Sequence, residues 1–376
     1  MTTKDYLTNK IQDEIWYCLQ CMMCKATCTT HHYTRREEDA PEPRVHLVEL
    51  IRRGILEWDE SSAETIFHCN LCGLCREWCA SKQDISAIMT TARADVVNQG
   101  LAPDSVVNVD ESLKNLKNVY GKPLDERLND ISLAGSSVND AEVIYFIGCL
   151  SAYDRQEIPK AMIKILEATR VNYTVLKGEE WCCGLPAYQL GLRDRAREMS
   201  EHNAKFITAT GVKTVIASCP GCARALDLEY PKWGTKLNVE VLHHTVFIKK
   251  LLDEGRLKLK KPITKKLTYH DPCHLGRDME IYDAPREILK QVSESDILEM
   301  FATREKALCC GSGGGYKLTN PEQANNMGSR ITDEAVFVKA DILVSACPLC
   351  KESFSKDAGE KGLELKDIAE LIIDSL

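Results

Sequence analysis

Eighteen cysteines in a chain of 376 residues constrain this protein more than any other feature of its sequence. Eight of them form two runs of identical spacing, C-x2-C-x2-C-x3-C: Cys18, Cys21, Cys24 and Cys28, then Cys69, Cys72, Cys75 and Cys79. Disulfide-rich chains are usually small and exported, whereas this chain is long and its first residues lack the apolar core of a signal peptide. We therefore expect a reducing compartment and metal ligation.

The spacing of these two runs is the one with which bacterial-type ferredoxins hold two [4Fe–4S] clusters. Three closely spaced thiolates bind three irons of one cubane, and the fourth cysteine reaches the other cluster. This predicts one cluster on Cys18, Cys21, Cys24 and Cys79, and a second on Cys69, Cys72, Cys75 and Cys28. Zinc is the alternative, but zinc modules usually separate two CxxC pairs by a longer loop. Thr29 and Ala80 replace the proline that usually follows each run.

The other ten cysteines form a second duplication, each copy holding a single cysteine, a CCG triplet and a CPxC pair. The first copy is Cys149, Cys182, Cys183, Cys219 and Cys222, and the second is Cys273, Cys309, Cys310, Cys347 and Cys350. Five thiolates exceed what one cubane or one zinc ion uses, and adjacent cysteines can reach two different irons. Structural thiols, one zinc ion per copy, and disulfides are the alternatives. The repetition of all five positions favours a larger or more open metal cluster in each copy.

The pattern around the second duplication alternates short apolar runs with helical stretches, which is typical of α/β lobes. Predicted buried strands cover 143–148, 214–218, 239–244, 266–270 and 341–346, and helices cover 159–170 and 196–210. Around the cysteine runs, helices are predicted near 44–54 and 84–100. We therefore predict an α+β chain with a helical two-cluster module at 1–105, a linker at 106–141 with a loop at 132–140, and α/β lobes at 142–260 and 261–376. Cys149, Cys219, Cys273 and Cys347 follow predicted strands, where parallel sheets place their ligands.

Together these motifs resemble the heterodisulfide reductase family over nearly the whole chain except the linker. The repeated C…CCG…CxxC pattern is similar to the CCG domain of that family, and the N-terminal module to its small iron–sulfur subunit. The fusion of both in one chain resembles the HdrD branch of the family. The resemblance implies a non-cubane [4Fe–4S] cluster on each set of five cysteines. It also implies, as substrate, the mixed disulfide of coenzyme M and coenzyme B, bound between the two clusters.

Several other residues are candidates for roles near the cysteines. His270, Asp271 and His274 flank Cys273 and could supply protons to leaving thiolates, or fix the loop and bond cluster sulfurs. Arg224 and Arg277 follow cysteine loops and could meet an anionic substrate, although a surface salt bridge is the commoner role of an arginine. The stretch 311–316, GSGGGY, fails the G-x-G-x-x-G pattern, so we interpret it as backbone that approaches a cluster or substrate closely. The helix expected from His244 is predicted to pack in the core, with a subunit contact as the alternative.

Three functions fit these patterns. The first is a catalytic disulfide reductase, and the second is an electron-transfer subunit of a flavin-dependent glycerol-3-phosphate, lactate or glycolate dehydrogenase. The third is an input subunit of a larger complex such as class II benzoyl-CoA reductase. Two complete sets of five cysteines favour the first. The expected partners are a flavoprotein or cytochrome b subunit and a small-molecule disulfide.

A net charge of −8 argues against nucleic acid as a partner. No stretch is apolar for the roughly 18 residues that a spanning helix needs. We expect a cytoplasmic protein, or one held at a membrane through a partner.

Overall fold

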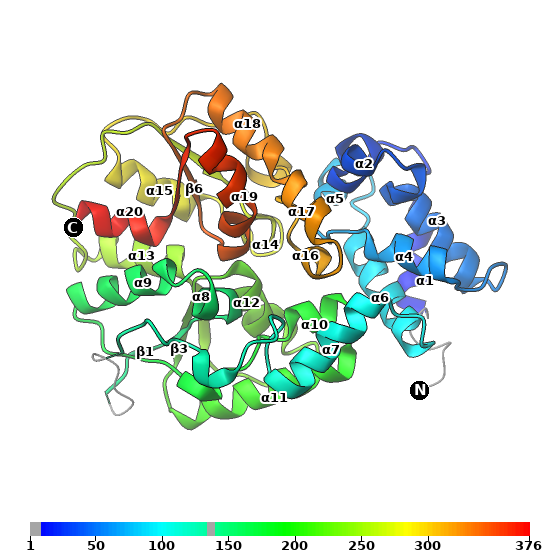
Figure 1. Ribbon diagram of the computed structural model, residues 1–376, viewed down its shortest axis with the longest axis horizontal. Helices are drawn as coiled ribbons and strands as arrows, with labels where there is room; N and C mark the ends of the chain where they lie inside the picture. The colour runs from blue at the N-terminus through cyan, green and yellow to red at the C-terminus, as the bar shows by residue number, and fades with distance from the viewer. Residues whose placement is uncertain (1–8, 134–139) are drawn as a thin grey trace.

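The structure is a computed structural model that describes residues 9–133 and 140–376. It has an N-terminal helical module and two α/β lobes, with the N-terminal module beside both lobes in Figure 1. The helices of the module are α1 (Asn9–Trp16), α2 (Thr29–Thr34), α3 (Pro41–Arg52), α4 (Glu60–Phe67), α5 (Leu74–Trp78) and α6 (Ile85–Asn98). The predictions at 44–54 and 84–100 are confirmed by α3 and α6. Local chemistry explains their starts, since Pro41 is the first residue of α3 and the Asp84 carboxylate accepts from the backbone N–H of Ala87 in α6.

The predicted linker contains more structure than the sequence indicated. Helix α7 (Asp104–Leu116) occupies its first third and buries Val106, Val109 and Leu113. These three residues recur at the i, i+3, i+7 spacing of one helical face, and that face packs against α11 and α16. The helix is therefore part of the folded body. Most of the loop predicted at 132–140 lies outside the described residues.

The first lobe contains a four-stranded parallel sheet in the order β2-β1-β3-β4. Its strands are β1 (Val143–Phe146), β2 (Tyr173–Thr174), β3 (Thr214–Ala217) and β4 (Glu240–His243). The second lobe has the parallel order β5-β6-β7, with β5 (Leu267–His270), β6 (Ile342–Ser345) and β7 (Glu364–Asp367). The five predicted strands are confirmed. Strands β2 and β7 were not predicted, because β2 spans two residues and β7, Glu-Leu-Lys-Asp, is largely polar.

Helices cover both small sheets and join the lobes (Figure 1). In the first lobe they are α8 (Cys149–Tyr153), α9 (Glu157–Ala168), α10 (Leu185–Gln189), α11 (Arg193–Ala209), α12 (Pro220–Arg224) and α13 (His244–Asp253). In the second they are α14 (Cys273–Gly276), α15 (Asp283–Val292), α16 (Tyr316–Thr319), α17 (Pro321–Met327), α18 (Ser329–Phe337), α19 (Pro348–Glu360) and α20 (Ile368–Ser375). Helix α20 packs against α9, and α13 against α15. The predicted core role of the helix from His244 is thus confirmed.

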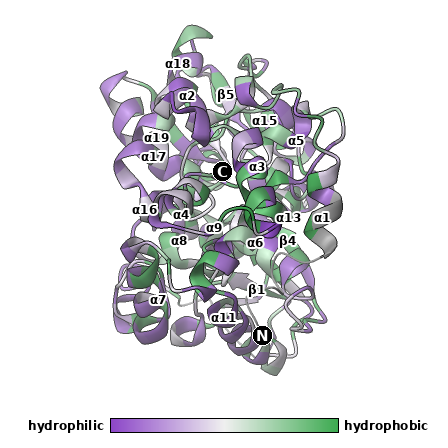
Figure 2. Ribbon diagram, turned by 90° about the vertical axis from the view of Figure 1, so that its right-hand side faces the viewer, coloured by the Kyte–Doolittle hydropathy of each residue, from purple (hydrophilic) through white to green (hydrophobic). Residues whose placement is uncertain are grey.

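One apolar core runs through both lobes, and it includes Ile248 and Leu251 of the first lobe and Leu371 and Ile372 of the second. Figure 2 looks onto the N-terminal module and shows green, hydrophobic stretches on α6 and mostly purple, hydrophilic surface on α11. No helix in the described part of the chain is long and apolar enough to cross a bilayer.

Candidate functional site: two five-cysteine sets and the cavity between the lobes

The single cysteines and the CPxC pairs lie just beyond the carboxyl ends of strands, as predicted. Cys149 begins α8 after β1, and Cys219 is the N-cap of α12 after β3. In the second lobe Cys273 begins α14 after β5, and Cys347 is the N-cap of α19 after β6. Because all strands of each sheet are parallel, these loops meet at one edge of the sheet.

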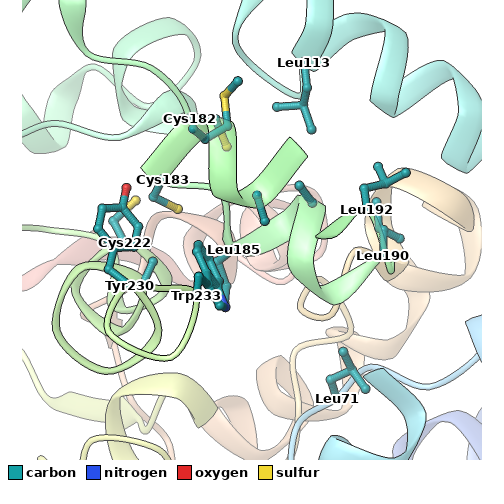
Figure 3. Packing of buried hydrophobic residues seen from close by; sticks show 14 of the residues in the cluster. Leu71, Leu113, Cys182, Cys183, Leu185, Leu190, Leu192, Cys222, Tyr230 and Trp233 are labelled. Atoms are coloured by element: carbon teal, nitrogen blue, oxygen red, sulfur yellow. The ribbon is translucent and has the colours of Figure 1, made fainter. Parts of the chain in front are cut away.

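Within each lobe the five thiols contact one another in the same order. In the first lobe the contacts run from Cys149 to Cys182, Cys183, Cys222 and Cys219. In the second lobe they run from Cys273 to Cys309, Cys310, Cys350 and Cys347. Each step joins counterparts from the two copies, so the duplication in sequence is also a duplication in space. Figure 3 shows the first set, with Cys182, Cys183 and Cys222 near Leu185, Tyr230 and Trp233.

The thiols of one set alter the acidity of their neighbours. Hydrogen bonds from the thiols of Cys182 and Cys222 lower the pKa of Cys183 to about 6. Hydrogen bonds from Cys309 and Cys350 likewise lower the pKa of Cys310 well below its usual range. Thiolates are the form of cysteine that binds metals, so each set contains a group suited to ligation.

Two further thiol contacts connect the sets. Cys219 of the first lobe contacts Cys347 of the second lobe. Cys72 of the N-terminal module contacts Cys309 of the second lobe, and this contact is the largest of the causes that lower the pKa of Cys72 to about 6. The second lobe therefore lies between the N-terminal module and the first lobe along the series of cysteines.

The two cysteine runs of the N-terminal module interleave. Cys18, Cys21, Cys24 and Cys79 line one small hollow. Cys28 lies instead close to Cys69 and Cys72. The structure thus brings together the two groups of four that the spacing predicted, each with its fourth member from the other run.

A cavity of about 370 Å³ lies between the two lobes. All five cysteines of the first set line it, whereas its lining on the second lobe is His274, the glycine loop from Ser312 to Gly315, and residues near the start of α19. Most of the remaining wall is apolar, including Val119, Leu185 and Leu318. The hydroxyls of Ser151 and Ser312 are buried here without a hydrogen-bond partner. A cavity with apolar walls and a few polar groups beside reactive cysteines is typical of a small-molecule site.

The three predicted proton donors occupy different places. His274 lines the cavity, where its Nε2 lies 3.4 Å from Gln189 Nε2 and its Nδ1 lies 2.6 Å from Asp278 Oδ2. Burial opposes protonation of His274, but the Cys273 thiolate and the Asp278 carboxylate raise its pKa overall. His270 is buried against Phe354 away from the cavity lining, and burial lowers its pKa.

Asp271 instead forms a bidentate ion pair with Arg286, with distances of 2.7 and 2.8 Å, and accepts from the backbone N–H of Arg304. This arrangement matches the alternative interpretation of Asp271, in which the carboxylate fixes the loop.

The two candidate arginines are both engaged by protein groups. Arg224 donates to Glu229 and Asp278. Arg277 donates from Nε to the Cys72 carbonyl, at 2.6 Å, and from Nη1 to the Ala307 carbonyl. Neither lines the cavity. Arg277 instead ties the second cysteine run to the second lobe.

The glycine loop makes the close approach that its sequence predicted, but partly to a different partner. A Cβ atom on Gly314 would lie 2.4 Å from the carbonyl oxygen of Asn70, in the second cysteine run. The Asn70 amide in turn donates to the Gly311 carbonyl at 2.8 Å. The loop therefore packs against the N-terminal module on one side and lines the cavity on the other.

Sequence reasoning missed several residues of this region. Val119 and Tyr120 of the predicted linker line the cavity, as do Gln189 and Lys317. Asn70 and Arg93 join the N-terminal module to the cavity wall. Asn70 lies inside a cysteine run, which is the one signal that could have drawn attention to it.

Comparison with known proteins agrees with this architecture. The family model described as "4Fe-4S dicluster domain" matches residues 14–83, and the CCG model, "Cysteine-rich domain", matches 143–227 and 267–355. The HdrD subunit of dihydromethanophenazine:CoB–CoM heterodisulfide reductase from Methanosarcina barkeri is 33% identical over 324 residues, covering 84% of this chain and 79% of the relative. The chain belongs to the HdrD family of heterodisulfide reductases.

Membership of the HdrD family makes this chain an iron–sulfur protein with a redox role. A more distant relative is the EtfAB:quinone oxidoreductase of Syntrophomonas wolfei, 30% identical over 340 residues, which cover 84% of this chain and 47% of that protein. The crystal structure of a hypothetical protein from Helicobacter pylori shares the fold, with a TM-score of 0.60 at 11% identity over all of this chain and 76% of that one.

The cysteines of this HdrD family member fit iron–sulfur clusters. All eighteen are free, and the eighteen fall into two groups of four and two of five. In the described ranges, no three His, Cys, Asp or Glu side chains are arranged to hold a single metal ion. Contiguous, largely buried thiols with low pKa members are the donor set that clusters use.

Proposed function

We propose that this chain reduces a small-molecule disulfide in the cavity between its lobes, the coenzyme M–coenzyme B heterodisulfide or a related one. The observation that carries the proposal is the series of thiol contacts from Cys72 to Cys309 and from Cys347 to Cys219, which ends at the cavity. A reductase that stores electrons in one module and uses them in another needs such a series.

Each set of cysteines would hold one cluster. The two cubane [4Fe–4S] clusters would use Cys18, Cys21, Cys24 and Cys79, and Cys69, Cys72, Cys75 and Cys28. The two non-cubane [4Fe–4S] clusters would use Cys149, Cys182, Cys183, Cys219 and Cys222, and Cys273, Cys309, Cys310, Cys347 and Cys350. Bound clusters supply single electrons, and the disulfide takes up two electrons and two protons to give two thiols.

The chain's own residues bind the substrate and handle protons. The apolar wall around Leu185 and Leu318 would hold the arms of the disulfide and exclude water. His274, oriented by Asp278, would donate a proton from Nε2 to a leaving thiolate. The hydroxyls of Ser151 and Ser312 would donate hydrogen bonds to sulfur in the cavity.

Electrons would come from another redox subunit, a flavoprotein or a cytochrome b. The relatives that are heterodisulfide reductase subunits, named as such, support this part of the proposal. The chain would work in the cytoplasm, or at a membrane through that partner.

One observation favours a second candidate function. The similarity to EtfAB:quinone oxidoreductase fits an electron-transfer role in which the chain passes electrons onward and another component does the chemistry.

Anaerobic oxidation of reduced viologen by the fully loaded chain, with coenzyme M–coenzyme B heterodisulfide as acceptor, separates the two functions. We expect thiols to appear in proportion to viologen oxidised. Val119→Trp, which fills the cavity, is expected to lower kcat/KM about 100-fold by displacing the substrate. Val107→Trp, on the exposed face of α7, is the matched control and is expected to have little effect. Loaded protein that reduces neither this nor any other disulfide would leave the electron-transfer function.

A further inference from the structure

The first cysteine run carries an exposed apolar patch, which we define as Trp16, Tyr17, Leu19 and Met23. Their exposed fractions are 82%, 59%, 70% and 50%. Leu19 and Met23 line the hollow formed by Cys18, Cys21, Cys24 and Cys79, and Cys21 itself is exposed. Single exposed apolar residues are ordinary, but a contiguous group around a functional site marks an interaction surface.

The internal repeat gives every residue of this run a counterpart in the second run. The two loops have the same backbone, since Gln20 and its counterpart Leu71 both have left-handed φ values, of 51° and 53°. Met22 and its counterpart Gly73 are also left-handed, with φ of 61° and 71°. The counterparts of the apolar patch are Phe67, His68, Asn70 and Leu74, and each is at most 3% exposed. The same face is thus buried in the second run and open in the first.

The second lobe covers the open side of the second run. Asn70 donates to the Gly311 carbonyl, and Arg277 donates to the Cys72 carbonyl. The ring of His68 faces Tyr316 of the second lobe, with ring centroids 6.4 Å apart. The Cys72 thiol contacts Cys309. The module that covers this face is therefore one that bears its own redox-active cysteines.

We infer that the apolar patch is the docking surface of a separate redox subunit, which covers the first run as the second lobe covers the second run. Its flavin, haem or iron–sulfur centre would lie next to Cys21, the counterpart of Cys72, and would pass single electrons to the chain there. The inference rests on the proposed function, in which another subunit supplies the electrons. Transient electron carriers dock in small encounters steered by charge, whereas stable subunits use apolar contacts. The apolar character of the patch therefore assigns it to a stably bound subunit.

Hydroxyl-radical footprinting tests this inference on the full chain, tagged and isolated anaerobically from its host with its bound subunits. We expect Trp16, Leu19 and Met23 to be labelled several-fold less in the complex than in the separately purified, cluster-loaded chain. Phe301 and Phe337, an exposed aromatic pair on the second lobe, are the internal control and should be labelled equally in both.

Variants give an independent readout. The double variant Leu19→Lys, Met23→Lys is expected to lose the cofactor-bearing subunit at every salt concentration, while Phe301→Lys, Phe337→Lys retains it. Iron and sulfide content confirms that the clusters remain, and the footprint of the unmodified chain decides the question if they do not.

Three footprinting results would overturn the inference. They are a patch that stays labelled while a redox subunit is bound, a patch already protected in the separate chain by its own first residues, and a patch covered by a second copy or by a subunit without a redox cofactor. Retention of the subunit by the lysine variant would also contradict it. Assembly needs no turnover, so the disulfide assay tests the proposed function separately.

Discussion

Substitution of Gly314 by alanine is expected to loosen the N-terminal module from the lobes and to slow electron delivery to the cavity. The new Cβ would lie 2.4 Å from the Asn70 carbonyl oxygen and 2.5 Å from its carbon, and these are backbone atoms that cannot rotate away. Gly314 also has a left-handed φ of 66°, which adds strain for alanine. Overpacking and backbone strain together should destabilise the junction by about 2–4 kcal/mol.

Gly313→Ala is the matched control for this prediction. It lies in the same loop, but its Cβ would meet the Asn70 carbonyl oxygen at 3.5 Å, an ordinary contact. The measurement is denaturant-induced loss of the visible cluster absorbance in the loaded chain, compared with disulfide reduction in the same samples. Equal midpoints for Gly314→Ala, Gly313→Ala and the unmodified chain would show that the close contact with Asn70 is not required.

Replacement of Arg93 by methionine is expected to have an effect at least as large. The Arg93 side chain is fully buried and donates only to backbone carbonyls. Its acceptors belong to three parts of the molecule: Ile66, Phe67 and Cys69 in the N-terminal module, Gln189 in the first lobe, and Gly314 in the second. Burial lowers its pKa to about 10, so the guanidinium stays charged at neutral pH.

Methionine keeps much of the volume of Arg93 but leaves these buried carbonyls without a donor, which should cost about 3–5 kcal/mol. The same denaturation measured on Arg52→Met provides the control. Arg52 pairs with Glu49 on the surface of α3, and loss of such a pair should cost less than about 1 kcal/mol. A stability loss for Arg93→Met no greater than for Arg52→Met would rule out a central role for this residue at the three-way junction.

Much of the fold could be predicted because its signals are local. Spacing alone paired Cys79 with the first run and Cys28 with the second. Short apolar runs located β1, β3, β4, β5 and β6, and the cysteines that follow four of them lie where parallel sheets place ligands. Two signals were too weak, since β2 is very short and β7 is polar.

The contacts between modules could not be predicted in this way. Asn70 and Arg93 each look like an ordinary polar residue until the fold brings them to Gly311 and Gly314, more than two hundred residues away in sequence. The glycine loop was interpreted correctly as a site of close approach, but its closest neighbour is the Asn70 backbone. Helix α7 was taken for a connector because its polar residues hide a narrow apolar face, and the cavity residues Val119 and Tyr120 that follow it were therefore missed.

A single-turnover experiment without mediator tests the central claim most directly. The loaded chain is reduced, freed of reductant, and mixed anaerobically with a stoichiometric amount of coenzyme M–coenzyme B heterodisulfide, and the free thiols are counted. The account predicts two thiols for every two electrons that the chain loses. Clusters that stay reduced while the disulfide remains intact would contradict it, and the chain would then serve in electron transfer only.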